Sequence, residues 1–154
     1  MAARYCTDAP KYKPERSSVK IYAVAALALS VSPALAAAPV TGKWMTAERD
    51  SIIEIGTCGA TVCGKVHRVM KMMDNGQAPI DANNPNPALR NRPVQGMMLL
   101  TGFTDGGNQW NGQIYDPKSG KTYKSKLSRN PDGTLKVQGC IGPFCKAFTW
   151  TAAK

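Results

Sequence analysis

The stretch LKVQGCIGPFCKAFTW, Leu135 to Trp150, decides the fold. Folded as a hairpin about Ile141-Gly142-Pro143-Phe144, it places Cys140 opposite Cys145. The same register places Val137 opposite Phe148 and Leu135 opposite Trp150 on one face, and it leaves the other face to the pairs Lys136 with Thr149 and Gln138 with Ala147. One pairing therefore predicts an apolar face, a polar face and a disulfide at the turn.

A second hairpin is predicted from Ser51 to Val69, SIIEIGTCGATVCGKVHRV. With Cys58 opposite Cys63, Ile55 faces Val66 on the inside and Glu54 faces His67 on the outside. The two hairpins share the spacing C-x4-C and the same sorting of apolar from polar residues. We therefore expect both to be antiparallel pairs with one buried face.

The amino-terminal segment has the pattern of a secretory signal. A basic region precedes the apolar run IYAVAALALSV, residues 21–31, which is followed by Ser32-Pro33-Ala34-Leu35-Ala36. The run is shorter than the ~20 residues that a membrane-spanning helix needs. We predict cleavage after Ala36, which removes residues 1–36 and leaves one domain, residues 37–154, in the periplasm or secreted. The alternative is an uncleaved amino-terminal anchor.

The charge of the chain limits the kinds of partner that we expect it to bind. Twenty basic and ten acidic residues give +10, and residues 37–154 keep fifteen and eight of them, or +7. These charges are spread from Lys43 to Lys154, without the basic stripe and interleaved aromatics of a nucleic-acid site. We expect no nucleic-acid partner, and a weak contact with an anionic membrane surface or acidic envelope polymer.

Four cysteines remain after the predicted cleavage: Cys58, Cys63, Cys140 and Cys145. An even number of cysteines in a small exported domain favours disulfides, and the two hairpin registers favour Cys58–Cys63 and Cys140–Cys145. The rival interpretation is a zinc site of four thiolates built from two C-x4-C units. An oxidising compartment disfavours it, so we expect no metal.

Alternation of apolar and polar residues dominates the rest of the chain. It indicates an all-β fold of about eight short antiparallel strands, with turns roughly every ten residues. Short links between neighbours favour an up-and-down barrel over a Greek key. The exception is Met70 to Pro93, a long loop in which Asn84-Pro85 is expected to start a short helical turn ending near Arg90.

Several motifs in order resemble a family of small exported bacterial proteins known as domain of unknown function 2147. They cover essentially Gly42 to Thr151 and are G-x-W at residues 42–44, CG-x3-CGK at 58–65, NPNPALRNRP at 84–93, YDPKSGKTY at 115–123 and DGTLKVQGC at 132–140. The family is similar to the calycins, the lipocalin-like barrels. The resemblance implies that fold and an extracytoplasmic location, and it implies no established activity.

The resemblance also implies that a cationic side chain packs on Trp44. In lipocalin-like barrels, an arginine of the last strand packs on the tryptophan of the first-strand G-x-W. Here Thr151 is followed by Ala152-Ala153-Lys154, so that arginine is missing. Lys146 or Arg68 is the expected substitute.

The sequence gives little support for a catalytic function. His67, the only histidine, is expected to form a surface pair with Glu54, and a catalytic dyad would need a third, orienting group and a pocket. No nucleophile elbow, phosphate loop or histidine-rich metal set is present. We predict that the protein is not an enzyme and carries no cofactor.

Asp81, Arg90 and Arg92 form the one polar group in the long loop that suggests a role. Two arginines can clamp a carboxylate or phosphate through bidentate bonds. The interpretation that we favour is that they tie the loop to the barrel through Asp81 and backbone carbonyls. For the methionines around the loop we favour core filling over an adaptable binding surface; these residues are Met70, Met72, Met73, Met97 and Met98.

Two functions follow. The first is binding of a small apolar or anionic amphipathic ligand in a barrel mouth under the 70–93 loop, with the candidate residues Trp44, Met98, Phe103, Trp110, Arg90 and Arg92. The alternative is an envelope structural or interaction module with a basic surface, in which Trp110, Tyr115, Phe148 and Trp150 fill the barrel. The free volume inside the barrel separates the two.

Overall fold

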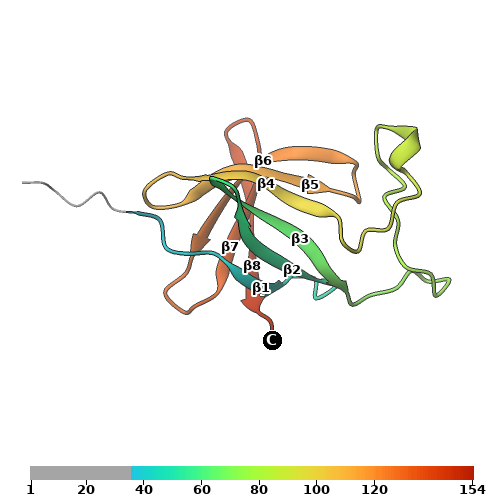
Figure 1. Cartoon of the computed structure of the whole chain (residues 1–154), viewed down its shortest axis with the longest axis horizontal. Helices are drawn as coiled ribbons and strands as arrows, with labels where there is room; N and C mark the ends of the chain where they lie inside the picture. The colour runs from blue at the N-terminus through green and yellow to red at the C-terminus, as the bar shows by residue number, and fades with distance from the viewer. Residues whose placement is uncertain (1–35) are drawn as a thin grey trace, which may run out of the picture. The chain divides into compact units, whose positions relative to one another are not determined.

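Eight antiparallel strands follow one another around a closed barrel (Figure 1). The structure is a computed structural model that describes residues 36–154, so the predicted signal segment lies outside the described residues except for Ala36. The strands are β1 (Gly42–Met45), β2 (Ser51–Cys58), β3 (Thr61–Val69), β4 (Met98–Asp105), β5 (Trp110–Asp116), β6 (Lys121–Arg129), β7 (Leu135–Ile141) and β8 (Phe144–Ala152). Each pairs with the next, and β1 closes the barrel on β8. The predicted all-β barrel of eight strands is confirmed.

The β7–β8 hairpin has the predicted register at every pair. Cys140 is opposite Cys145, Val137 is opposite Phe148, and Leu135 is opposite Trp150. Leu135 and Val137 are buried in alternation along β7, as a strand with one face in the core requires, whereas Cys140 is buried on the opposite face, where it is bonded to Cys145.

The predicted register of the β2–β3 hairpin is wrong by two residues. Cys58 lies opposite Thr61 and Cys63 opposite Gly56, while Ile55 faces Gly64 and Glu54 faces Lys65. The turn is therefore the two-residue Gly59-Ala60, and Gly59 takes the positive φ of 63° that such a turn needs. A bulge between Ile52 and Ile53 then shifts the register of the remaining pairs by one residue.

The barrel interior is filled by large apolar side chains. The most buried are Trp44, Ile53, Leu100, Phe103, Leu127, Leu135, Val66 and Val137. The packing is close enough that a Cβ atom added to Gly112 would lie 2.6 Å from the ring of Phe103. Each such side chain contributes about 1.5–3 kcal/mol by leaving water, so the filled interior is the main source of stability.

Because the strands run up and down, the connections divide between two ends of the barrel. The amino-terminal end has the turns at 59–60, 106–109 and 130–134, together with the segment Ala37–Val40 that precedes β1. The loop end has the turns at 46–50, 117–120 and 142–143, together with the long connection 70–97. In Figure 1 this long connection extends to the right of the strands.

The segment before β1 closes the amino-terminal end. Val40 has no exposed surface and belongs to the core cluster. The indole nitrogen of Trp44 donates to the carbonyl of Val40 at 2.9 Å, and that of Trp110 donates to the carbonyl of Ala38 at 2.9 Å. The chain itself therefore occupies this mouth of the barrel.

The cation that packs on Trp44 is Arg129, and it comes from β6. Its guanidinium carbon lies 4.7 Å from the centre of the indole ring. The expectation that Lys146 or Arg68 takes this place is wrong, because Lys146 lies over Phe148 at 5.1 Å and Arg68 is on the exposed side of β3. A stacked arginine at this position adds a cation–π contact to the closed end.

No helix among residues 36–154 is long and apolar enough to cross a bilayer.

Candidate functional site

The long loop between β3 and β4 has a fixed internal structure. A bridge between Ile80 and Pro93 brings its two sides together. Beyond the bridge, a 3-10 turn, η1, spans Pro87–Leu89, and the side chain of Asn86 caps it by accepting from the amide of Ala88 at 3.1 Å. The predicted helical turn is confirmed, but it starts at Asn86-Pro87, two residues later than expected. Asn84-Pro85 and Asn86-Pro87 carry the same Asn-Pro signal for the start of a helical turn, so the sequence alone did not distinguish them.

Asp81 is the centre of the loop and is completely buried. Its Oδ1 accepts from the hydroxyl of Tyr115 at 2.6 Å, and its Oδ2 accepts from Asn84 at 2.6 Å. The same Oδ2 accepts from Nε of Arg92 at 2.9 Å, and a second guanidinium nitrogen of Arg92 lies 2.8 Å away. Since Tyr115 belongs to β5, this cluster ties the loop to the barrel wall.

The electrostatics of Asp81 follow from these partners. Burial by itself would raise its pKa, but the hydrogen bonds from Tyr115, Asn84 and Arg92, together with the charge of Arg92, hold the pKa below the ordinary 3.8. The pKa of Tyr115 is raised by burial and by the neighbouring Asp81 carboxylate. Asp81 is thus an ionised carboxylate, and both of its oxygens accept hydrogen bonds.

Both arginines of the loop are engaged within it. Arg92 pairs with Asp81, and Nε of Arg90 donates to the backbone carbonyl of Asn84 at 2.8 Å. This is the tethering arrangement that we favoured from the sequence. Sequence reasoning did not connect Tyr115 and Asn84 with Asp81, although these two residues begin the motifs YDPKSGKTY and NPNPALRNRP. The motifs mark the residues, but a contact between a strand and a distant loop does not follow from either motif alone.

The six residues proposed to bind a ligand do not gather in one mouth. Trp44 and Phe103 are buried in the core cluster, and the half-buried Trp110 packs against it. Met98 is 42% exposed at the start of β4, and Arg90 and Arg92 lie in the loop. The three aromatic residues thus share one site, which is the packed core.

The interpretation of the methionines as core filling is wrong for four of the five. Met97 is buried, whereas Met70, Met72, Met73 and Met98 are between 42% and 53% exposed. They lie in or beside the loop, where no strand covers them. The loop therefore presents apolar surface to solvent as well as polar groups.

Two grooves lie beside the β7–β8 hairpin. The larger, of about 720 Å³, is lined by residues of β4–β8 and of the hairpin turn, which are Thr101, Gly102, Asn111, Gly112, Gln113, Lys124, Ser125, Lys126, Cys140, Gly142, Pro143 and Cys145. The smaller, of about 410 Å³, is lined by Lys121 to Lys124 and by Cys140 to Gly142. Lys124, Cys140 and Gly142 belong to both grooves, so the two grooves adjoin at the hairpin.

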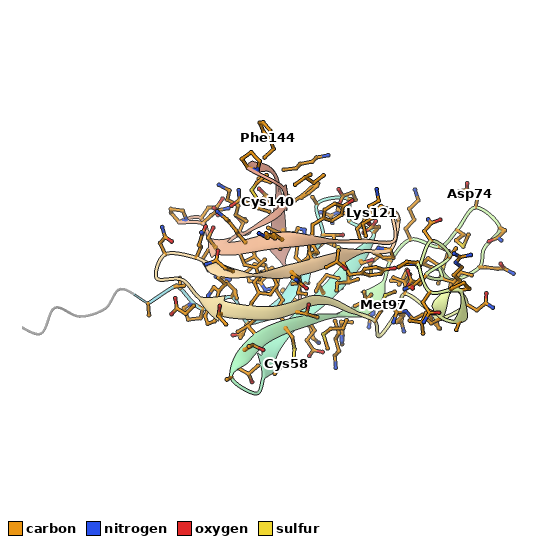
Figure 2. All side chains as sticks on the ribbon, turned by 90° about the horizontal axis from the view of Figure 1, so that it is seen from above. Cys58, Asp74, Met97, Lys121, Cys140 and Phe144 are labelled. Atoms are coloured by element: carbon orange, nitrogen blue, oxygen red, sulfur yellow. A yellow bond between two sulfur atoms is a disulfide. The ribbon has the colours of Figure 1, made fainter. Side chains whose placement is uncertain are left out.

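The tip of this hairpin carries the two most exposed large apolar side chains among the described residues. Ile141 is 71% exposed and Phe144 is 81% exposed. Figure 2 shows Phe144 projecting from the barrel beyond Cys140. The Cys140–Cys145 disulfide lies directly behind the two residues and cross-links the hairpin at its last pair but one. The apolar tip is therefore held on a rigid support.

The excess positive charge of the domain lies in the same part of the chain. Residues 121–154 contain seven basic residues, Lys121, Lys124, Lys126, Arg129, Lys136, Lys146 and Lys154, against the single acidic residue Asp132. Asp132 lies in the turn at the amino-terminal end, so β6, β7 and β8 contain no acidic residue. The basic residues are spread along the sequence as expected, but the net charge is concentrated on these three strands.

All four cysteines of the described domain form disulfides, Cys58–Cys63 and Cys140–Cys145, as predicted. The first lies next to the turn of the amino-terminal end and the second next to the hairpin turn of the loop end, and Figure 2 shows Cys58 and Cys140 on opposite sides of the barrel. A zinc site that uses all four sulfurs is incompatible with this arrangement.

His67 lies on the surface, as expected. Its Nδ1 is 3.7 Å from Oε2 of Glu54, and the ammonium of Lys65 lies 3.4 Å from the same oxygen. Residues 36–154 contain no cluster of three or more His, Cys, Asp and Glu side chains that could hold a metal. The histidine therefore belongs to an exposed charge group of small energetic weight.

The closed eight-stranded antiparallel barrel, with a tryptophan of β1 under the segment that covers one end, defines a lipocalin-like protein. More particularly, residues 42–152 match the bacterial family described as "Uncharacterized protein conserved in bacteria (DUF2147)", and the chain belongs to that family. The resemblance inferred from the motifs is thereby confirmed.

A solved structure supports the class. HP1028 from Helicobacter pylori, described as belonging to the lipocalin family, is 26% identical, with a TM-score of 0.65 over 75% of this chain and 84% of HP1028. No curated protein matches the chain.

Proposed function

We propose that this chain is an exported bacterial protein that docks on anionic lipid surfaces through the tip of its β7–β8 hairpin. The observation that carries the proposal is the exposure of Ile141 and Phe144 on a disulfide-linked turn whose neighbouring strands are basic and free of acidic residues. An apolar tip with a basic surround matches the two layers of an anionic membrane, its acyl boundary and its charged headgroups.

The energetics suit reversible binding. Removing Phe144 and Ile141 from water contributes about 1.5–3 kcal/mol for each side chain that becomes fully buried. Each lysine close to an anionic surface adds about 1 kcal/mol, and Lys121, Lys124, Lys126 and Lys146 are available in β6 and β8. The sum gives measurable but salt-sensitive binding, far weaker than the insertion of a spanning helix.

Export is part of this proposal. Two disulfides in a small domain suit an oxidising compartment, and the apolar run at residues 21–31 has the anatomy of a cleaved signal. Membership in a family of unknown function with a lipocalin-like fold suggests a role other than catalysis. A docking protein needs no catalytic group.

The test is co-sedimentation of the purified domain, residues 37–154, with vesicles of phosphatidylcholine alone and with added phosphatidylglycerol. We expect binding only to the anionic vesicles, and a loss of about tenfold or more in Phe144→Ser, since one buried aromatic side chain accounts for that much. Met72→Ser is the matched control, because Met72 is 53% exposed but lies in the long loop.

Three results would contradict the proposal. These are equal binding to neutral vesicles, undiminished binding by Phe144→Ser, and an equal loss in Met72→Ser. Binding to a soluble acidic polymer without binding to vesicles would assign the basic surface to a different partner.

A small ligand inside the barrel is the second candidate, and one observation favours it. Ser125 is 2% exposed, and its hydroxyl has no hydrogen-bond partner among residues 36–154. By register it shares the inner face of the wall with its cross-strand neighbours Gly112 and Gly139. Ser125 and Gly112 also line the larger groove, and a ligand with one polar atom would satisfy this hydroxyl.

Native mass spectrometry of protein purified from its own host tests this second function. A bound mass that is lost in Ser125→Ala and kept in Ser128→Ala, on the other face of β6, would support it. Protein of the bare polypeptide mass in all three forms would contradict it.

A further inference from the structure

The segment from Ala37 to Val40 is held at its beginning as well as at its end. Ala37 is 7% exposed and Val40 is fully buried, whereas Ala36 is exposed. The carbonyls of Ala38 and Val40 accept from the indole nitrogens of Trp110 and Trp44. The change from exposed to buried thus falls at the peptide bond between Ala36 and Ala37.

The nitrogen of Ala37 lies between both oxygens of one carboxylate. It is 3.0 Å from Oδ1 and 3.2 Å from Oδ2 of Asp105, at the end of β4. Oδ1 also accepts from the amide of Gly107 at 2.7 Å. Among the described residues, Asp105 has no Lys, Arg or His partner within ion-pair distance.

This arrangement suits an ammonium group better than an amide. A backbone amide has one hydrogen to share between the two oxygens, whereas a terminal ammonium has three hydrogens and a full positive charge. The amide–carboxylate bond already has one charged partner, and an ammonium adds a second charge of opposite sign, so that Coulomb attraction is added to the hydrogen bonds. Asp105 therefore has the geometry of a carboxylate that receives a chain terminus.

We propose that the chain is processed between Ala36 and Ala37 and that the new terminus forms an ion pair with Asp105. Hydrolysis of this peptide bond by a signal peptidase consumes one water, leaving a carboxylate on Ala36 and an ammonium on Ala37. The inference rests on the export that belongs to the proposed function. It goes beyond the cleavage predicted from the sequence by assigning Asp105 as the partner of the new terminus.

The structure also distinguishes this cut from its neighbours. A cut one residue earlier leaves the charge on the exposed Ala36, and a cut one residue later removes the nitrogen that contacts Asp105. Only the Ala36–Ala37 cut places the ammonium at the carboxylate. Because the same segment carries Val40 into the core, processing would strengthen the closure of the amino-terminal end.

The test is a double-mutant cycle on melting temperature. One protein begins at Ala37, released from a fusion by a protease that leaves no extra residue, and the other carries Gly-Ser before Ala37. Each is made with Asp105 and with Asp105→Asn. Asp105 is exposed, so in the protein that begins at Ala37 we expect Asp105→Asn to lower the melting temperature by about 1–4 °C more than in the extended protein.

Asp132→Asn is the matched control, since Asp132 lies in another turn of the same end and its carboxylate bonds only with Thr134. Its effect should be the same in both backgrounds. Equal effects of Asp105→Asn in the two backgrounds would overturn the inference.

Amino-terminal sequencing of protein from its native host completes the test. A chain that starts at Ala37 supports the inference. An exported chain that starts elsewhere overturns it and leaves the proposed docking function standing. An unprocessed intracellular chain overturns both the inference and the export on which it rests. Vesicle binding by Asp105→Asn should equal that of the unchanged protein, so the two proposals fail independently.

Discussion

The β2–β3 and β7–β8 hairpins share the spacing C-x4-C and a disulfide, but they differ in register. Cys140 and Cys145 are directly opposite, with Cα atoms 4.0 Å apart. Cys58 and Cys63 are offset by two residues, with Cα atoms 5.8 Å apart. Both hairpins turn through two residues, but the turn follows Cys58 directly at Gly59-Ala60, whereas Ile141 separates Cys140 from the turn at Gly142-Pro143. Cysteine spacing therefore predicts the cross-link and leaves the register to the turn.

The two tips also differ in chemistry. The β2–β3 tip consists of the small residues Gly59 and Ala60, next to Thr61. The β7–β8 tip exposes Ile141 and Phe144 beside strands that carry only basic charges. A disulfide stabilises both tips, so the exposed side chains distinguish their roles. This comparison locates the proposed docking surface at β7–β8.

The largest expected effect on stability comes from a substitution in the core at the base of the β7–β8 hairpin. Trp150 is 5% exposed and lies opposite Leu135 at the far end of the hairpin from its tip. Trp150→Ala should cost about 3–5 kcal/mol of unfolding free energy, measured by urea denaturation. Thr149→Ala, on the exposed face next to it, is the control. A soluble Trp150→Ala protein with an unchanged midpoint would contradict the core assignment.

A smaller loss is expected from the loop tether, which belongs to neither hairpin. Asp81→Asn places an amide among three donors, and the loss of a buried acceptor should cost about 1–3 kcal/mol. Vesicle binding by the folded protein should not change, because the side chain of Asp81 bonds with Tyr115, Asn84 and Arg92 and with no residue of the hairpin tip. A change in vesicle binding without a change in stability would assign the loop a docking role.

The tether also predicts an acid dependence. The pKa of Asp81 is lower in the folded protein than its ordinary 3.8, so its contribution to stability is fully present above that pH. The contribution is lost as the pH falls through the folded-state pKa. Below pH 4, the difference in unfolding free energy between the unchanged protein and Asp81→Asn should shrink. A difference that is constant down to pH 2 would contradict the assignment.

Removal of each disulfide compares the hairpins directly. Both close a loop of the same length, with a sequence separation of five, so each double Cys→Ser variant should lose about 2 kcal/mol. Only Cys140→Ser with Cys145→Ser should also weaken vesicle binding, because it frees the apolar tip. Equal loss of vesicle binding in both double variants would remove the distinction between the hairpins.

Much of the fold followed from the sequence for local reasons. Alternation, turn residues and short links predicted the eight strands, and the β7–β8 register followed because the cysteine pairing and the apolar alternation agree there. In β2–β3 the cysteine pairing misled, because the turn follows Cys58 directly at Gly59-Ala60 and places the two cysteines two residues out of register. The bulge at Ile52, which shifts the last pairs by one more residue, has no separate sequence signal. Sequence patterns predict the pairing of adjacent strands well, and they predict bulges and the exact position of turns poorly.

The candidate site was harder to predict, because it depends on contacts across the barrel. Arg129 reaches Trp44 from a strand that is not its neighbour in the sheet, and Tyr115 reaches Asp81 across 34 positions in sequence. The aromatic residues proposed to bind a ligand proved to be core, since composition does not distinguish an apolar lining from an apolar filling. The exposure of Phe144 depends on how far the hairpin projects.

The most direct measurement compares the two tips by placing a tryptophan at each. Phe144→Trp and Ala60→Trp are mixed with phosphatidylglycerol vesicles that carry a lipid-bound quencher, and each emission spectrum is corrected by that of the unchanged protein. We predict a blue shift and strong quenching for the tryptophan at position 144, with neither at position 60. An unchanged spectrum at position 144, or equal quenching at both tips, would contradict docking through the β7–β8 hairpin.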